Sequence, residues 1–310
     1  MNTPRISVVG FCDPTHVDQS AQYVDRFLKQ TLPHDQFEML IVEDVQAARF
    51  RETLTACAAH HPDLAFRYVE VKLPGRAAAI NAGIAQARAP IVAIFADDAI
   101  PTADALAAHL HYHESNRDPM AVSIGPMLFR NELRHDPFRR WLEDSGSLFG
   151  LSMQQQFTRW PASFFYCGNC AIKRELIDQI GGFDERFVWF TWDDYEFGLR
   201  LSAAGGYSQY VSAALAWHEH RVTLGERARV MRTGGHAARL HESFGISNRP
   251  WQAMLDSARA QRHMLLPADD EHLPLVERIP TFQAYLNRAF LEGYEAESRG
   301  DRTDIVLLQS

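Results

Sequence analysis

The amino-acid sequence predicts an α/β protein with a mainly parallel central sheet and a helical C-terminal extension. Short apolar runs recur through residues 1–220 and are separated by segments with helical spacing, an alternation typical of parallel sheets covered by helices. Two of these runs end directly in adjacent acidic residues, which places charged groups where open α/β sheets bind ligands. Only helical spacing remains in residues 221–310, so we predict a catalytic-type domain over residues 1–220 and a helical extension after it.

The composition is that of a globular chain with a substantial core. The 310 residues are 46% hydrophobic, and the net charge of −8 with a pI near 5.9 does not favour broad attraction to nucleic acid, so no nucleic-acid partner is expected. No apolar run approaches the roughly 18 residues needed to cross a bilayer. The start MNTPRISVVG enters a strand pattern without a charged-then-apolar leader, so we expect a cytoplasmic protein. Four cysteines are too few for a disulfide framework at this length.

Four strands are expected in the first hundred residues. Their sequences are ISVVGF at 6–11, FEMLIV at 37–42, FRYVEV at 66–71 and IVAIFA at 91–96. The carboxyl ends of parallel strands share one edge of a sheet, where ligands bind. We therefore expect Asp44, which follows the second strand, to lie near Asp97 and Asp98, which follow the fourth.

The run PIVAIFADDAIP at residues 90–101 carries the strongest chemical signal of this half. Adjacent side chains on a strand point to opposite faces, so at least one of Asp97 and Asp98 must turn toward the ligand crevice. Mg²⁺ and Mn²⁺ bind oxygen ligands, commonly one or two carboxylates plus substrate phosphates. The pattern therefore favours a site for a divalent metal that carries a diphosphate. The simpler alternative is that the two acids are solvated at the end of the strand.

An alanine-rich helix is expected between Pro74 and Pro90. Its first turn carries Arg76, a candidate phosphate contact because anions bind at helix N-termini, although a solvated arginine is the commoner situation. Asn81 lies in mid-helix, where Asn is a poor helix former, so we expect it to hydrogen-bond to a neighbouring group. On the following helix His109, His111 and His113 resemble a metal cluster, but we favour a structural role for them.

A further strand is expected at 121–129, and the less regular segment 130–163 after it is a candidate acceptor region. Residues 164–172, FFYCGNCAI, predict an apolar strand interrupted at Gly168-Asn169 and followed by a short helix that ends at Gly181. The CGNC sequence has redox-pair spacing, but cysteines in an apolar strand are usually unreactive.

The segment WDDYEFGLRLSAAGG predicts a helix with Asp193, Asp194 and Glu196 in its first turn. Acids at this position complement the helix dipole without any further function. Three aromatic residues lie directly before them, namely Trp189, Phe190 and Trp192. They suggest a partly desolvated setting in which a carboxylate acts as a general base.

A strand-like run over 207–217 ends with His218, Glu219 and His220, and either histidine is a candidate to complete a metal site with Asp98. Helical patterns follow at about 223–244, 250–266 and 281–299. Residues 221–240 carry five arginines against one glutamate, a bias that fits an anionic membrane surface or, more simply, a solvated helix face. Peripheral contact with the inner face of a membrane and homodimer formation are left open.

Taken together, four segments resemble family 2 glycosyltransferases and cover about residues 5–220. They are ISVVGF with IVED, GRAAAINAGIAQARAPIVAIFADDAIP, CGNCAIKRELIDQIGGFDERF, and WDDYEFGLRLSAAGGY followed by AWHEH. The resemblance implies a GT-A fold, a nucleotide-sugar-binding α/β sandwich. It also implies transfer of a sugar from a nucleotide-diphosphate donor, first a UDP-sugar, to an acceptor hydroxyl with inversion and with Mn²⁺ or Mg²⁺.

The resemblance also assigns roles to residues. It implies donor binding by Asp44, Arg76, Asp97 and Asn169, metal binding by Asp98 and His218, and catalysis by Asp194 as general base with Asp193 beside it. The chain departs from the family pattern at three positions. Ala96 replaces the first acid of the D-x-D motif, Asp193 replaces a glutamate, and Ile80 replaces an arginine found in many members.

Two alternatives remain from the sequence. A sugar nucleotidyltransferase would need a glycine-rich basic loop after the first strand, and FCDPTHVD does not provide one. A non-catalytic scaffold would fit the loss at Ala96, whereas the retained Asp98, Asp194 and His218 favour an enzyme. A glycan, a lipid-linked molecule and a small molecule are all open as the acceptor.

Overall fold

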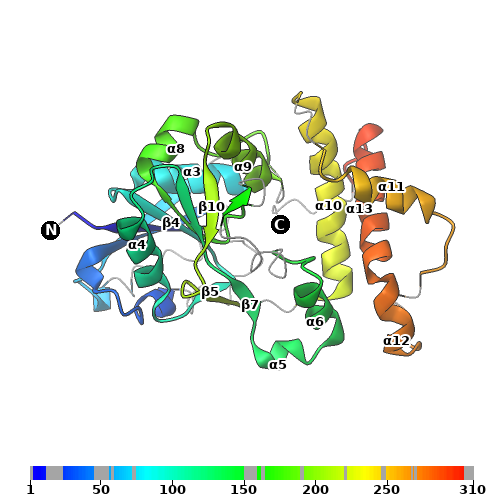
Figure 1. The fold of residues 1–310 in the computed structure, drawn as a ribbon, viewed down its shortest axis with the longest axis horizontal. Coiled ribbons are helices and arrows are strands. Elements are labelled where there is room, and N and C mark those ends of the chain that lie inside the picture. Colours follow the sequence, from blue (N-terminus) through cyan, green and yellow to red (C-terminus); the bar gives the residue numbers. More distant parts are fainter. Residues whose placement is uncertain are drawn as a thin grey trace. The chain divides into compact units, whose positions relative to one another are not determined.

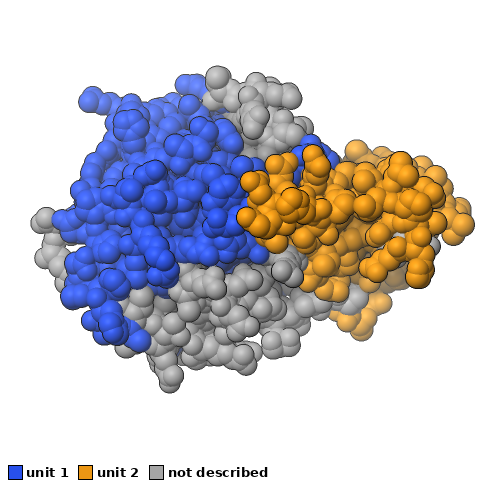
Figure 2. Space-filling view, turned by 90° about the horizontal axis from the view of Figure 1, so that it is seen from below, with its two compact units in different colours: residues 1–130, 143–188, 193–220 blue, residues 131–142, 189–192, 221–310 orange. Residues whose placement is uncertain are grey.

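The computed structural model describes most of the chain and divides it into two compact units (Figures 1 and 2). The described residues are 3–11, 24–44, 56, 59–71, 75–149, 159–161, 165–188, 192–219, 222–245, 249–266, 268 and 271–303. Unit 1 holds residues 1–130, 143–188 and 193–220, and unit 2 holds residues 131–142, 189–192 and 221–310. Two segments that the sequence assigns to the first domain, 131–142 and 189–192, thus group with the C-terminal helices. The functional domain boundary at residue 220 stays a prediction.

The described part of unit 1 is built on an eight-stranded, mixed sheet with the order β3-β2-β1-β4-β9-β6-β10-β8. Its first four members run parallel, whereas β9 runs antiparallel between β4 and β6. The strands are β1 (Ile6–Phe11), β2 (Phe37–Asp44), β3 (Ala65–Val71), β4 (Ile91–Ala96), β6 (Ala121–Ile124), β8 (Trp160–Pro161), β9 (Asn169–Lys173) and β10 (Tyr207–Tyr210). The predicted α/β class with a mainly parallel sheet is confirmed.

Strand register aligns the carboxyl ends of three strands. Phe11 of β1 pairs with Val42 of β2 on one side and with Ala96 of β4 on the other. The β1 and β4 strands match the predicted runs residue for residue, because central parallel strands are buried on both faces and read as continuous apolar sequence. The backbone of Asp44 and the start of the Asp97-Asp98 pair therefore lie at one edge, as expected.

Two long strand predictions are wrong in extent. The run 121–129 breaks at Gly125-Pro126 into β6 and β7 (Met127–Phe129), and the run 207–217 breaks into β10 and β11 (Ala216–His218). The pieces after each break join β5 (Ala99–Pro101) in a separate three-stranded sheet of order β5-β11-β7. The first break falls at Pro126, because a proline lacks the N–H that a central strand must donate. Pro126 O accepts a bond from Ala216 N at 2.9 Å, and the second break falls at a turn in which Ala214 N donates to Val211 O at 2.9 Å.

Helices of unit 1 cover the sheet (Figure 1). They are α3 (Arg76–Gln86), α4 (Ala105–Ser115), α8 (Arg174–Ile180) and α9 (Asp193–Ala203). Of these, α3 and α9 begin at the carboxyl edge of the sheet, whereas α8 begins at the amino edge beside Pro90. The α3 helix contacts β1, β2 and β3, and α4 contacts β4, β6 and β9. The α9 helix begins at Asp193 and buries Phe197 and Leu201, so the amphipathic helix expected from the sequence is confirmed.

Unit 2 is helical, and its main feature is the pair α10 and α13, which lie side by side (Figure 1). Its elements are α5 (Asn131–Arg134), α6 (Pro137–Asp144), α10 (Leu224–Ser243), α11 (Gln252–Ala260), α12 (Leu275–Arg278), the short 3-10 turn η6 (Ile279–Thr281) and α13 (Phe282–Ser298). Thr223 caps α10 in a capping box with Glu226. None of the described helices combines the length and the apolar character that a bilayer crossing requires.

Two of the four arginines of α10 lie against acids. Arg232 pairs with Glu292 of α13, and Arg239 lies 3.3 Å from Glu242. These pairs account for part of the charge bias that the sequence shows in residues 221–240, and they favour the solvated-face interpretation over a membrane contact.

Glycines set the distance between α10 and α13. A Cβ atom added to Gly235 would lie 2.0 Å from Phe290 O, and one added to Gly293 would lie 1.9 Å from Arg232 O. Both distances are far below any real contact. The two backbones therefore touch at this crossing because neither residue carries a side chain.

We predict that Gly235→Ala destabilises unit 2 by about 1–3 kcal/mol, because the new methyl group forces the two helices apart. Gly225→Ala is the matched control in the same helix. Nothing lies within 4 Å of the Cβ position at Gly225, so the better helix former should leave stability unchanged or raise it by up to about 1 kcal/mol. Urea unfolding of the two variants and the wild type measures the difference, and equal midpoints would contradict the packing argument.

Candidate active site

The first acidic group follows β4 at the carboxyl edge of the sheet. Asp97 is 2% exposed, and Asp98 is partly exposed and faces His218 of β11, with Nε2 of the imidazole 3.0 Å from Oδ2 of the carboxylate. The contact arises because β11 pairs antiparallel with β5 and places His218 opposite Ala99. The predicted meeting of Asp98 and His218 is thus confirmed, whereas the side chain of Asp44 lies outside the described residues.

The end of β11 is anchored by ion pairs that the sequence did not indicate. Glu219 accepts two bonds from the Arg26 guanidinium at 2.9 and 3.0 Å and one from Arg130 Nε at 2.6 Å. Partial burial acts against the charged form, but these hydrogen bonds dominate and lower the pKa of Glu219. The anchored strand end holds His218 beside Asp98.

The chemistry of this group suits a hard divalent cation in part. Among the described side chains, three potential metal ligands come within 4.8 Å of one another at a different place in the fold. They are His34, His61 and Asp63. At the carboxyl edge the protein presents Asp98 and His218 as a pair. Mg²⁺ and Mn²⁺ commonly take one or two protein ligands and complete their shell with water and substrate phosphates, so the pair fits such an ion only together with a diphosphate.

The second group joins the first turns of α3 and α9. Arg76 is buried and donates from Nε to Asp193 Oδ2 at 2.9 Å and from its terminal nitrogen to the other oxygen of the same carboxylate. Asp194 Oδ2 lies 3.5 Å from Arg76. Burial opposes the charge on Arg76, yet the two carboxylates hold its pKa well above the usual value.

Gly75 allows the start of α3 to lie close to the backbone of Val188. Gly75, directly before Arg76, has φ of +108°, a conformation that L side chains rarely adopt, and its Cβ position would lie 3.0 Å from the backbone of Val188. Asn81 in mid-helix accepts a bond from Phe183 N at 2.8 Å and donates to Phe183 O at 2.8 Å. The expected hydrogen bond from Asn81 is therefore confirmed, and it ties α3 to the segment that leads toward α9.

Asp193 and Asp194 differ in access. The side chain of Asp193 is fully buried and both its oxygens accept from Arg76, whereas 23% of the Asp194 side chain is exposed. Desolvation raises the pKa of Asp194 to about 6, with Arg76 opposing the shift and Asp193 adding to it. Asp194 is thus the more accessible carboxylate of this pair.

The CGNC segment links the two acidic groups. Ala96 N, at the end of β4, donates to Gly168 O at 3.0 Å, and the neighbouring Cys167 interacts electrostatically with Arg76 and Asp194. Both thiols are buried, and burial raises the pKa of Cys167 and of Cys170. Raised thiol pKa values oppose thiolate formation, so the preference for unreactive cysteines over a redox pair is supported.

Asn169 has an interior position. Its side chain is fully buried, donates to Pro126 O at 3.1 Å and to Ala214 O at 2.8 Å, and lies 3.0 Å from His109 Nε2. A donor contact by this amide stays a prediction, and the geometry gives Asn169 a structural role.

His109 and His113 are interior too. His109 contacts Ser123 and Asn169, and His113 contacts Ser123 and Ala171 O. Burial lowers the pKa of His109 to about 4 and that of His113 to about 3, so both are neutral core residues at pH 7. The favoured structural role for these histidines is supported.

The buried ion pair of Arg76 with Asp193 leads to a prediction about the free energy of unfolding. Arg76→Met should cost about 3–5 kcal/mol, because it leaves the Asp193 carboxylate buried without its counter-charge. The double variant Arg76→Met with Asp193→Asn should recover a large part of that loss, since no uncompensated charge remains. Chemical denaturation of the two variants and the wild type gives the two differences. A double variant no more stable than the single one would show that the pair does not compensate charge.

The family model and the similar proteins both indicate a glycosyltransferase family. The model of "Glycosyl transferase family 2" matches residues 19–181, more than half of the chain. A chondroitin synthase of Pasteurella multocida is 28% identical over 41% of this chain, and the cellulose synthase 1 catalytic subunit (UDP-forming) of Komagataeibacter xylinus is 29% identical over 59%. The matched regions are 11% and 24% of those relatives, so the chain aligns with at most about a quarter of either.

Solved structures confirm the fold. The mannosyltransferase PcManGT from Pyrobaculum calidifontis, in complex with GDP-Man and Mn²⁺, superposes with a TM-score of 0.63 at 19% identity and covers 96% of this chain and 88% of its own. S. aureus TarS 1-349 in complex with UDP-GlcNAc gives 0.53 at 14% identity, over 96% of this chain and 93% of its own. The GT-A fold expected from the sequence is shared with these enzymes. The chain belongs to glycosyl transferase family 2.

Proposed function

We propose that this protein transfers a sugar from a nucleoside-diphosphate donor to an acceptor hydroxyl with inversion, and that Asp194 is the general base. The single observation that carries the proposal is the partly exposed Asp194 carboxylate, with its pKa raised to about 6, beside a buried and charge-neutral Arg76–Asp193 pair. A base whose pKa lies slightly below the working pH is mostly ionised and still accepts a proton readily.

Inversion requires attack from the face opposite the leaving group. The acceptor hydroxyl forms a bond to the anomeric carbon while the bond to the diphosphate breaks, and the hydroxyl proton passes to Asp194. The nucleoside diphosphate leaves with additional negative charge. Because Asp194 lies on α9 and Asp98 follows β4, the two groups that face acceptor and donor come from different elements.

Asp98 and His218 are proposed to hold the divalent metal, and Asp97 and Asp44 to contact the donor. A bound Mn²⁺ or Mg²⁺ would neutralise the charge that develops on the diphosphate. The observed Asp98–His218 contact of 3.0 Å supports a role in metal binding for these two residues. Mn²⁺ is present in the complex of the mannosyltransferase neighbour, which favours it as the first ion to test.

Arg76 and Asp193 receive roles that differ from the sequence expectation. The Arg76 guanidinium faces Asp193, so the pair is proposed to position the start of α9 and to keep a second negative charge away from Asp194. A direct phosphate contact by Arg76 would have to use guanidinium N–H groups other than those that donate to Asp193. The acceptor is proposed to be a glycan or a lipid-linked or small hydroxyl compound, and a cytoplasmic place with peripheral membrane contact stays a prediction.

The first test is Asp194→Asn. Loss of the base should lower the transfer rate by about 10²–10⁴ while leaving donor affinity unchanged, because the amide keeps the shape of the side chain. In the wild type, transfer should fall as the pH drops through about 6, where Asp194 becomes protonated. Initial rates from pH 5 to 8, together with donor titration of the variant, measure both effects.

Stability gives an independent readout for the same residue. The folded protein raises the pKa of Asp194 from the ordinary 3.8 to about 6, so its ionisation costs stability as the pH rises through this window. Asp194→Asn should therefore melt higher than wild type at pH 7 and show no such gain near pH 3. The matched control is Glu196→Gln in the same helical turn, which loses a pair with Arg200 and should melt lower yet retain transfer. Near wild-type transfer by Asp194→Asn would refute the base assignment.

Donor class can be found by thermal melting against UDP-, GDP-, dTDP- and CMP-sugars, each with Mn²⁺ and with EDTA. UDP-sugars come first, because the cellulose synthase relative is described as UDP-forming, and GDP-mannose comes second. A donor at about 100 times its dissociation constant adds roughly 2.7 kcal/mol, which a melting curve resolves. The shift should disappear with EDTA and in Asp98→Asn. A shift that both treatments leave intact would contradict the proposed metal site, and binding without transfer would favour the scaffold alternative.

A further inference from the structure

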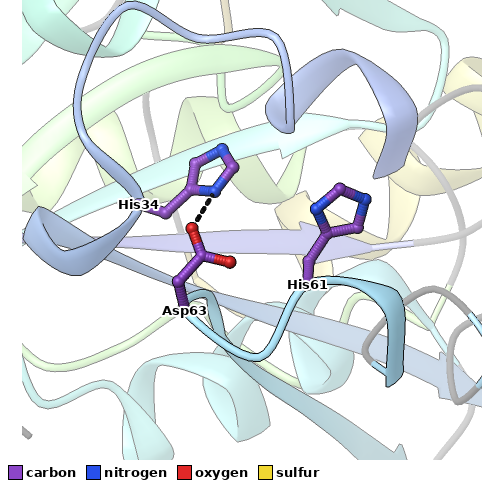
Figure 3. Close-up of side chains that lie close together, drawn as sticks. All are labelled: His34, His61 and Asp63. Atoms are coloured by element: carbon purple, nitrogen blue, oxygen red, sulfur yellow. Dashed lines mark hydrogen bonds and ion pairs between the residues drawn. The ribbon is translucent and has the colours of Figure 1, made fainter.

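A second cluster of metal-ligating side chains lies at the opposite edge of the sheet. His34, His61 and Asp63 offer ligand atoms that all lie within 4.8 Å of one another. Figure 3 shows the two imidazoles and the carboxylate facing a common space, with His34 and Asp63 in direct contact. His34 lies directly before β2, and the other two residues lie directly before β3, so the cluster sits at the amino ends of these strands. A strand of six residues spans roughly 20 Å, which separates this cluster from Asp98.

Hydrogen bonding around His34 fixes which ring nitrogen faces the cluster. Its Nε2 lies 3.1 Å from the Leu28 carbonyl oxygen, which only accepts, so Nε2 carries the proton. The other ring nitrogen, Nδ1, therefore faces the cluster and lies 2.8 Å from Asp63 Oδ2.

The Leu28 contact is the arrangement that metal-binding histidines typically show. A ligating imidazole almost always donates its other ring N–H to a carbonyl or carboxylate, which fixes the tautomer and the ring orientation. The ring of His34 also packs edge-on against Phe37, with centroids 5.8 Å apart. His34 is thus oriented before any ion binds.

Both ligand-bearing segments are rigid turns that contain proline. Gln36 N donates to Pro33 O at 2.9 Å around His34, and Leu64 N donates to His61 O at 3.1 Å around Pro62-Asp63. Proline holds its φ near −65°, so each turn loses little entropy when its side chains are fixed. Parallel pairing of β2 with β3 then brings the two turns together.

We propose that His34, His61 and Asp63 bind a divalent transition-metal ion, best matched by Zn²⁺, which joins the amino ends of β2 and β3. Two imidazoles and one carboxylate suit Zn²⁺, whereas Mg²⁺ and Mn²⁺ favour oxygen ligands. Ligand atoms around tetrahedral Zn²⁺ lie about 3.4 Å apart. The three ligand atoms lie within 4.8 Å of one another, and the His34–Asp63 contact of 2.8 Å would lengthen by about half an ångström as the ion enters. Water would fill the fourth position. The site is independent of the proposed transferase function.

Calorimetric titration of the metal-free full-length protein with ZnCl₂ tests the proposal. Wild type should bind one equivalent at this site, and binding should raise the melting temperature. His61→Ala and Asp63→Asn should weaken binding at least about tenfold. The matched control is His60→Ala, because His60 is the exposed neighbour of His61 and its Nδ1 faces Ala56 O instead. This control should bind as wild type does.

Two further measurements keep the result unambiguous. Asp98→Asn should leave the Zn²⁺ equivalent intact, so that failure of the proposed donor-metal site and failure of this site are distinguished. His61→Ala and Asp63→Asn should melt as wild type does in EDTA, which shows that they fold. Absence of Zn²⁺ binding in wild type, or equal binding in wild type and both variants, would overturn the proposal and leave His34 and Asp63 as a hydrogen-bonded surface pair.

Discussion

The buried ion pair between Arg76 and Asp193 is the constraint on which the rest of the candidate active site depends. Two adjacent carboxylates in a desolvated setting cannot both ionise readily unless a cation compensates one of them. Arg76 binds both oxygens of Asp193 and lies 3.5 Å from Asp194, so one acid is neutralised and the other is left to titrate. The difference in access follows from the same contact, because the paired carboxylate is fully buried and its neighbour is not.

Contacts remote in sequence maintain this pair. The positive φ of Gly75 lets the start of α3 lie against the backbone of Val188, and Asn81 ties the same helix to Phe183. Beside Asp98, Arg26 and Arg130 anchor Glu219 and so hold the end of β11. Each acidic group is therefore supported by a short network of hydrogen bonds from a different element, as a preorganised site requires.

Metal chemistry differs at the two edges of the sheet. The carboxyl edge presents Asp98 with one histidine, a pair that needs substrate phosphates to complete the shell of a hard cation. The amino edge presents two histidines and a carboxylate on proline-containing turns, a set that suits a softer ion without substrate. No short motif in the sequence joins His34, His61 and Asp63, because 26 residues lie between the first two. Their common position directly before two parallel strands was the signal that would have found them.

By itself the sequence determined the α/β class, the parallel strands, the acidic strand ends and the order of the family segments. These features were readable because continuous apolar runs report strands buried on both faces, and helical spacing reports the covering helices. Only the tertiary structure decided that Arg76 faces Asp193, that Asn169 is interior, that Asp194 is the accessible acid and that the runs at 121–129 and 207–217 divide between two sheets. Each of these outcomes depends on which distant segments meet at one edge, and local propensity carries no information about partners more than a few residues away.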